Sequence, residues 1–255
     1  MATNTLWAVA LFALGCEYID SSLGMGYGTT LTPVLLLLGF TPAEVVPSVL
    51  LSEFVAGVFA GLLHHQFGNV DFAPGSRCLR VVLLLAACGV AGTLAAVLIA
   101  VVVPAWILEA YIGLLVLGIG IGLLATRKKN TEFSWRKMIG LGLVAAINKG
   151  LSGGGYGPLL TGGQIMTGVG EKEAIGITSL AEGLTCLVGV AAYAITGADN
   201  TDWRLAPTLI LGAVLSVPFS AITVKNLPVS RMRWVIACGV AGLGAFTLMR
   251  LVFWA

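Results

Sequence analysis

Two glycine-rich segments, 129 residues apart, divide the chain into two similar halves. The first reads Asp20-Ser-Ser-Leu-Gly-Met-Gly-Tyr-Gly28, and the second reads Lys149-Gly-Leu-Ser-Gly-Gly-Gly-Tyr-Gly157. The same offset, without a gap, also pairs Leu31 with Leu160, Thr32 with Thr161, Glu44 with Glu173 and Glu53 with Glu182. A match at one fixed offset indicates an internal duplication. Each segment interrupts an apolar run, and paired interruptions in two halves of a membrane chain point to the binding site of a transporter.

Composition places both halves in lipid. Of the 255 residues, 58% are hydrophobic and only 10% are charged, whereas soluble domains carry about 25% charged residues. In a bilayer the backbone must satisfy its own hydrogen bonds, so the chain is helical or a closed barrel. The long apolar runs do not alternate, which argues against a barrel. We therefore expect an all-α polytopic membrane protein. The first ten residues lack a basic region, so we expect no removable signal peptide.

Each half has the same predicted plan. Two short apolar segments flank the break, at residues 6–19 and 29–40 in the first half and 138–147 and 158–169 in the second. A crossing needs about 20 residues, so each short pair predicts a re-entrant, broken-helix hairpin. Three longer runs follow in each half, at residues 43–65, 76–103, 105–126, 172–195, 205–224 and 230–253. Thr41-Pro-Ala-Glu44 has the pattern of a helix start, with a capping residue, a proline and then an acid.

Three spans per half is an odd number, so the second half would enter the membrane upside down relative to the first. We divide the chain into membrane repeat 1 (residues 1–126), a basic cytoplasmic linker (127–137) and membrane repeat 2 (138–255). This topology puts 11 of the 14 lysines and arginines on the linker side, two (Arg204 and Arg250) outside and Lys149 in the second break. That bias follows the positive-inside rule. We expect both termini outside.

Lys149 and the glycines around it predict an anion site. Glycines let backbone N–H groups approach a ligand, and the short helix expected from Pro158 directs its N-terminus at the same spot, which favours negative charge. The first break supplies the same geometry. Tyr27 and Tyr156 are candidate donors to the substrate, or packing residues with a hydroxyl partner. The candidate substrate-binding residues are Gly24, Gly26, Tyr27, Gly28, Asn148, Lys149, Ser152, Gly153, Gly154, Gly155 and Tyr156.

Four acids accompany Lys149 at membrane depth, namely Glu17, Asp20, Glu53 and Glu182. An ionised side chain at the bilayer centre costs about 2.5–3.5 kcal/mol on the mildest scale, so such residues are rarely idle. If the two breaks meet, Asp20 and Lys149 can pair. Burial favours the neutral form of a carboxyl group, so the acids are candidates for coupling transport to H⁺ or Na⁺. The alternatives are neutral acids in interhelical hydrogen bonds and, for Glu17, solvation near an interface.

Other side chains give no sign of catalysis. The five cysteines form no metal or redox spacing and are interpreted as small apolar packing residues. His64 and His65 end a predicted span and are interpreted as interfacial. The sequence has no nucleotide loop, metal cluster or Ser/His/Asp set, so we expect no enzyme, no catalytic residue, no metal and no cofactor beyond the coupling ion. The expected partners are a small anion and the lipid bilayer, with no nucleic acid; a homodimer stays open.

The duplicated breaks, Leu23-Gly-Met-Gly-Tyr-Gly28 and Ser152-Gly-Gly-Gly-Tyr-Gly157, resemble those of the sulfite exporter TauE/SafE family, also called the TSUP permeases. Thr41-Pro-Ala-Glu44, the Glu53 and Glu182 spans and the length fit the same family. The resemblance implies transport of sulfite, organosulfonates and other sulfur-containing or small organic anions across the cell (inner) membrane. No cysteine lies in either break, which disfavours thiosulfate handling by a reactive thiol. We expect a secondary transporter of small sulfur-containing oxyanions; the alternatives are a passive anion channel and a transporter of another small organic anion such as a carboxylate.

Overall fold

The computed structural model describes residues 3–100, 105–125, 132–152, 155–196 and 203–254. These residues form ten helices and no strand, which confirms the all-α class. The helices are α1 (Thr3–Leu23), α2 (Tyr27–Leu37), α3 (Pro42–Gln66), α4 (Arg77–Ala100), α5 (Ala105–Ala125), α6 (Trp135–Ser152), α7 (Tyr156–Met166), α8 (Glu171–Thr196), α9 (Leu205–Asn226) and α10 (Val229–Trp254).

Each half contains the expected break, but the helix before it is longer than predicted. Residues 6–19 were expected to be too short to cross; α1 instead has 21 residues, and Leu6–Leu23 is apolar and long enough to span. In the second half α6 begins at Trp135, inside the expected linker, and runs to Ser152. The sequence reading stopped each helix at its first polar residues. Those residues stay helical because they are buried and bonded, as when the Ser21 hydroxyl donates to Glu17 Oε1 at 2.5 Å.

Glycine ends α1 and caps α7. Gly24 and Gly26 have φ of 72° and 125°, and Gly155 has φ of 76°; residues with a side chain rarely adopt these values. The start of α3 follows its sequence signal, because the Glu44 carboxylate accepts the Thr41 backbone N–H at 2.8 Å and Pro42 is the first helical residue.

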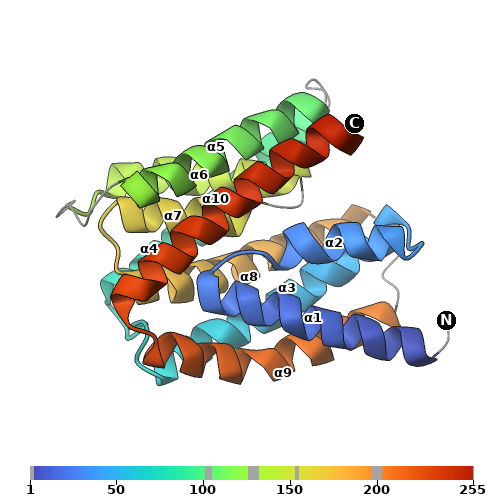
Figure 1. Cartoon of the computed structure of the whole chain (residues 1–255), viewed down its shortest axis with the longest axis horizontal. Helices are drawn as coiled ribbons and strands as arrows, with labels where there is room; N and C mark the ends of the chain where they lie inside the picture. Colours follow the sequence, from blue (N-terminus) through green and yellow to red (C-terminus); the bar gives the residue numbers. More distant parts are fainter. Residues whose placement is uncertain (1–2, 101–104, 126–131, 153–154, 197–202, 255) are drawn as a thin grey trace.

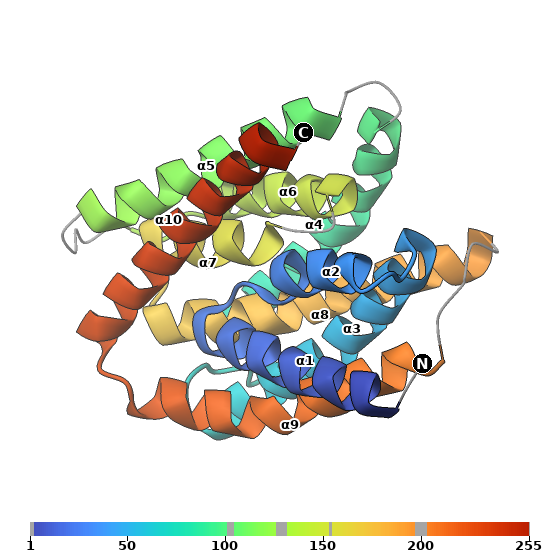
Figure 2. The same cartoon turned by 45° about the vertical axis from the view of Figure 1, so that its right-hand side comes forward.

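The two hairpins open toward opposite ends of the molecule. In Figure 1 the start of α1 and the end of α2 lie at the right, whereas the start of α6 and the end of α7 lie at the left; the rotated view in Figure 2 agrees. The longer helices run between the two ends, and the last helix finishes at the same end as the start of α1.

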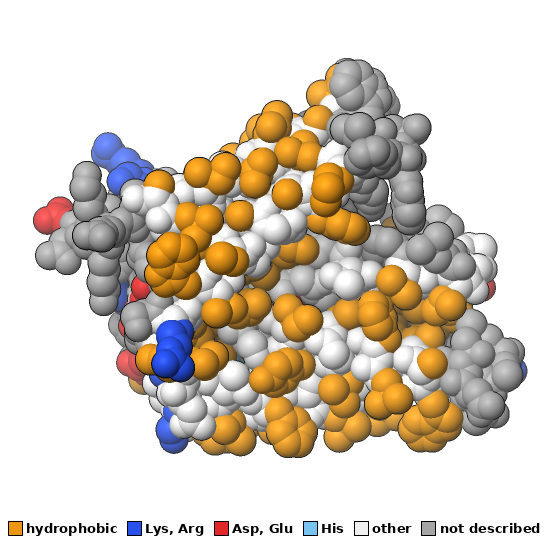
Figure 3. Space-filling view, viewed as in Figure 1, with side chains coloured by type: hydrophobic (Ala, Val, Ile, Leu, Met, Phe, Trp, Pro, Cys, Tyr) orange, Lys and Arg blue, Asp and Glu red, His pale blue; other side chains and the backbone are white. Residues whose placement is uncertain are grey.

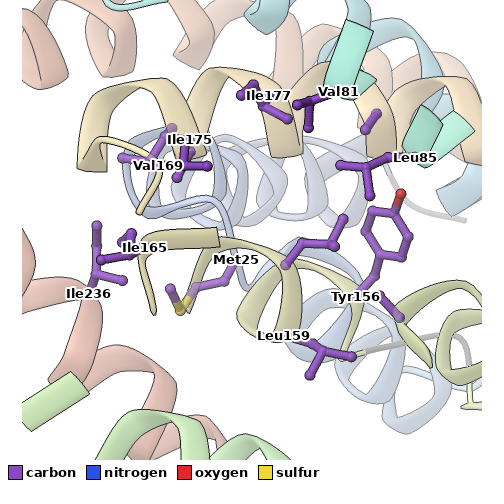
Figure 4. Packing of buried hydrophobic residues seen from close by; sticks show 14 of the residues in the cluster. Met25, Val81, Leu85, Tyr156, Leu159, Ile165, Val169, Ile175, Ile177 and Ile236 are labelled. Carbon is purple, nitrogen blue, oxygen red and sulfur yellow. The ribbon is translucent and has the colours of Figure 1, made fainter. Parts of the chain in front are cut away.

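The two halves interleave, so that helices of one half pack against helices of the other. Helix α1 packs on α9, and its counterpart α6 packs on α4; α3 packs on α8, and α5 packs on α10. One buried cluster joins α1–α3 to α9. A second cluster joins α4–α8 and α10, and Met25 of the first break lies within it, near Leu159 and Ile165 (Figure 4).

The outer surface is apolar along the middle of the molecule. Figure 3 shows hydrophobic side chains over the face formed by α1, α9 and α10, with lysine, arginine and acids gathered at the left end. Within the described residues, four helices are long and apolar enough to cross a membrane, and α5 and α10 contain further apolar stretches, Gly113–Ala125 and Trp234–Met249. The chain is thus a polytopic membrane protein, as predicted.

Segments far apart in sequence meet at the charged end. Arg77, at the start of α4, pairs with Glu173 of α8 at 3.2 Å and lies 5.3 Å from the ring centroid of Phe133, just before α6. Lys172 donates from Nζ to the carbonyl of Lys225 at the end of α9. The starts of α4, α6 and α8 and the end of α9 therefore share one side, as the positive-inside argument requires.

Candidate functional site

The site is organised by the crossing of α3 and α8, which are equivalent helices of the two halves. Glycine permits the crossing: a Cβ added at Gly57 would lie 2.7 Å from the Ser179 carbonyl oxygen and 3.0 Å from the Cα of Gly183. Membrane helices use small residues in this way to bring backbones close together. Glu53 lies one turn before Gly57, and Glu182 directly precedes Gly183. The crossing therefore places the two duplicated glutamates opposite each other.

Lys149 lies between these two carboxylates. Its Nζ donates to Glu53 Oε2 at 2.9 Å and to Glu182 Oε1 at 2.6 Å. The three side chains are 6%, 7% and 12% exposed for Lys149, Glu53 and Glu182. Buried charges persist when they are paired and hydrogen-bonded. One ammonium thus links the equivalent acids of the two halves, and the trio has a formal charge of −1 when all three are ionised.

The expected ion pair between Asp20 and Lys149 is wrong. Both residues lie in the last helical turns of α1 and α6, not in the break loops. Asp20 Oδ1 instead accepts the backbone N–H of Tyr27 at 3.1 Å, at the first residue of α2. An acid here satisfies a free helix N–H and complements the helix dipole. Lys149 is engaged by the glutamates, which sequence spacing alone could not place beside it.

Glu17 is not a solvated interface residue. It is 3% exposed, and its Oε1 accepts the Ser21 hydroxyl. The Ser21 carbonyl in turn lies 2.9 Å from His64 Nε2, and His64 Nδ1 lies 3.0 Å from the side-chain nitrogen of Asn69. His64 is fully buried within the protein, and its interpretation as interfacial stays a prediction. The arrangement ties α1 to the end of α3 and to the loop after it.

The two tyrosines are buried, each with a hydroxyl partner in its own half. Tyr27 Oη lies 2.7 Å from Ser52 Oγ, and Tyr156 Oη lies 3.2 Å from Thr185 Oγ1. The Tyr156 ring also faces Lys149, with 5.6 Å from Nζ to the ring centroid. Both tyrosines therefore follow the alternative in which they pack with a hydroxyl partner. To contact a substrate, either hydroxyl must first give up its hydrogen bond to Ser52 or Thr185.

The two breaks touch each other, as predicted. The Thr161 hydroxyl on α7 donates to the Gly24 carbonyl at 2.9 Å, and a Cβ at Gly157 would lie 2.5 Å from that same carbonyl oxygen. Thr161 Oγ1 also lies 3.1 Å from Thr178 Oγ1, which accepts from Gln164 Nε2 at 2.8 Å. This polar chain fixes the first break onto α7 and α8. Asn148 is buried beside Lys149, whereas Gly153, Gly154 and the Ser152 side chain lie outside what the structure describes.

Sequence reasoning missed one member of the site, Cys186. Its Sγ lies 3.1 Å from Glu53 Oε2, the same oxygen that accepts from Lys149. Cys186 is fully buried on α8, four residues after Glu182. Residues four apart share a helix face, and that spacing was the available signal. The general interpretation of cysteines as apolar packing residues hid it.

Known proteins resemble this chain over most of its length. The model of a family described as "Sulfite exporter TauE/SafE" matches residues 8–247, a range that includes both breaks and the buried Lys149 cluster. A protein of Bacillus subtilis (strain 168), "Probable membrane transporter protein YtnM", is 29% identical over 228 residues, which cover 85% of this chain and 74% of that protein. No solved structure matches the chain. The resemblance drawn from the two breaks is confirmed.

Proposed function

Because this chain belongs to the sulfite exporter TauE/SafE family of membrane transporters, we propose that it is a secondary transporter of a small sulfur-containing oxyanion, sulfite or an organosulfonate. Transport is coupled to H⁺ or Na⁺. The observation that carries the proposal is the position of Lys149, a buried cation at the contact of the two halves, in the last turn of α6 and close to the start of α7.

An oxyanion binds where cationic and backbone donors converge. The first N–H groups of α7, after the left-handed cap Gly155, have no acceptor within the helix and favour negative charge. Glycine lets the two breaks approach each other closely, since Gly157 lies against the backbone of Gly24. The anion binds between the two breaks, at the Lys149 ammonium and the start of α7, with Asn148 and Tyr156 beside it.

Charge balance explains why a cation must bind together with the anion. Lys149 with Glu53 and Glu182 is already at −1, and Glu17 and Asp20 bring the total to −3 when all are ionised. A further anion is repelled unless a cation enters with it. A proton or Na⁺ at one carboxylate neutralises it and releases part of the Lys149 ammonium for the oxyanion. Coupling is therefore a consequence of the excess of acids in a buried site.

The membrane orientation belongs to the same proposal. The charged end, with the starts of α4, α6 and α8, faces the cytoplasm of the cell, and both termini lie outside. The two hairpins then open toward opposite sides of the membrane, with their two breaks in contact. This is the arrangement of inverted-repeat transporters, in which the substrate binds between broken helices at the bilayer midplane.

A flux panel in proteoliposomes tests the function. Sulfite, organosulfonates, thiosulfate and carboxylates are compared under an imposed pH gradient, an imposed Na⁺ gradient and neither. We expect sulfite or an organosulfonate to be taken up, faster under one of the two gradients. Flux that follows the substrate gradient alone would make the protein a passive channel. A preference for carboxylates would mean that the site binds another class of organic anion.

A further inference from the structure

Glu53 and Glu182 are equivalent in the duplication but differ in their hydrogen bonds. Glu53 Oε2 has two donors, Lys149 Nζ at 2.9 Å and Cys186 Sγ at 3.1 Å. Among the described residues, Glu182 Oε1 has one donor, Lys149 Nζ at 2.6 Å. The second oxygen of Glu182, Oε2, is buried and has no hydrogen-bond partner among the described residues. The two acids that share one lysine are therefore chemically unequal.

The difference originates at one pair of equivalent positions. Cys186 corresponds to Gly57 at the offset of 129 residues. From α8, the thiol reaches across to Glu53 on α3. From α3, Gly57 has no side chain to reach Glu182, and a Cβ there would press on the Ser179 carbonyl. Close packing of the two helices thus requires glycine on one side and leaves room for a donor only on the other.

Hydrogen-bond donors stabilise the ionised form of a carboxyl group, and burial without donors favours its neutral form. We propose that Glu182 is the carboxyl group that binds and releases the transported proton, and that Cys186 is a positioning residue that keeps Glu53 ionised as the permanent partner of Lys149. This inference rests on the proposed function and selects H⁺ as the coupling ion. A proton from water adds to Glu182 Oε2, which leaves Lys149 with one ionised partner and frees an N–H for the oxyanion. On release, the proton returns to water.

The surroundings of Glu182 support proton uptake. Lys149 approaches from α6 and Glu53 from α3, Tyr156 from α7, and Glu17 and Asp20 of α1 act on it through space. Along the middle of α4 and α10 the titratable groups are the thiols of Cys88 and Cys238, since the arginines of these helices lie near their ends. Of the two acids bonded to Lys149, Glu182 has fewer donors than Glu53, so the excess of acids around one lysine favours protonation of Glu182 over Glu53.

Two transport assays separate the acids. Exchange of labelled sulfite at equal pH requires binding but no net proton movement, whereas uptake driven by a pH gradient requires both. We expect Glu182→Gln to slow exchange less than Glu53→Gln does and to lose the acceleration by a pH gradient. We expect Glu53→Gln to lose both, because Lys149 then has no permanent partner. Glu182→Asp, which keeps the acid, should restore coupling. The opposite pattern, with coupling lost only in Glu53→Gln, would overturn the assignment.

The role of Cys186 is tested with variants that keep or remove its hydrogen-bond donor. Cys186→Ser keeps a donor toward Glu53, and Cys186→Ala removes it. Without the donor the ionised form of Glu53 is less well stabilised, so exchange in Cys186→Ala should fail on the acid side about half to one pH unit earlier than in wild type. Cys186→Ser should follow the wild-type profile. Identical profiles for Ala and Ser would remove the positioning role.

A spectroscopic measurement does not depend on the substrate. Infrared difference spectra of the solubilised protein during acidification report the carbonyl band of a newly protonated carboxyl group. The component that is missing in Glu182→Gln should appear at a higher pH than the component that is missing in Glu53→Gln; the reverse order would overturn the inference. If sulfite and sulfonates show no flux, the proposed function fails while this titration still decides between the two acids.

Discussion

Glu53 and Glu182, 129 positions apart, accept hydrogen bonds from the same ammonium group, at 2.9 Å and 2.6 Å from Lys149 Nζ. The duplication made them equivalent, and the α3–α8 crossing made them neighbours. The lysine that links them occurs in one half only, because its counterpart is Asp20. A duplicated scaffold therefore carries an asymmetric site.

Replacing Lys149 by Met should lower stability and abolish anion binding. Two buried carboxylates would lose their cation, and breaking a buried ion pair costs about 3–5 kcal/mol. Thermal unfolding in detergent should show the loss at neutral pH and a smaller loss at acid pH, where the acids are neutral. Lys137→Met, on the exposed part of the same helix, is the matched control and should change stability by less than about 0.5 kcal/mol. Sulfite affinity that survives Lys149→Met in calorimetry would remove the proposed anion site.

Replacing Gly57 by Ala should disturb the crossing that holds the two glutamates. The added Cβ would lie 2.7 Å from the Ser179 carbonyl oxygen, and overpacking of this kind costs about 1–3 kcal/mol. We expect a lower unfolding temperature and reduced transport. Gly118→Ala is the control, because nothing lies within 4 Å of the added Cβ. Equal effects of the two substitutions would show that the helix crossing does not determine the geometry of the site.

Replacing Thr161 by Val should loosen the contact between the two breaks. The hydroxyl that donates to Gly24 and contacts Thr178 disappears while the side-chain shape is kept, which leaves a buried carbonyl without its donor at a cost of about 1–3 kcal/mol. Unfolding temperature and transport rate should both fall. In the control, Thr247→Val, the lost hydroxyl bonds only to Leu243 of its own helix. No difference from that control would mean that the inter-half contact is dispensable.

Labelling in whole cells tests the membrane orientation. In a Cys238→Ser background, which removes the exposed natural cysteine, one variant carries Trp203→Cys and the other Asn226→Cys, at the two ends of α9. Both positions are exposed. A membrane-impermeant maleimide should label the first in intact cells and the second only after the cells are opened. Labelling of the second position alone in intact cells would reject the proposed orientation.

Several features of the fold followed from local patterns. The capping residues at Thr41 and Glu44 marked the start of α3, and the glycines placed both breaks, where the chain needs a backbone conformation that residues with side chains avoid. Helix lengths were less predictable. Asp20 and Lys149 looked like loop residues because charge is costly in lipid, yet each lies in a helix and is bonded.

By itself, the sequence determined the lipid-embedded helical class, the duplication, the position of both breaks and the set of buried charges, because hydropathy, repetition and glycine act locally along the chain. Only the tertiary structure decided which charges meet. Helix α1 packs on α9 and α6 on α4, so the two halves interleave, and the close α3–α8 contact brings Lys149, Glu53, Glu182 and Cys186 together. Side-chain partners across such a contact depend on the rotation and separation of whole helices, which no local pattern encodes.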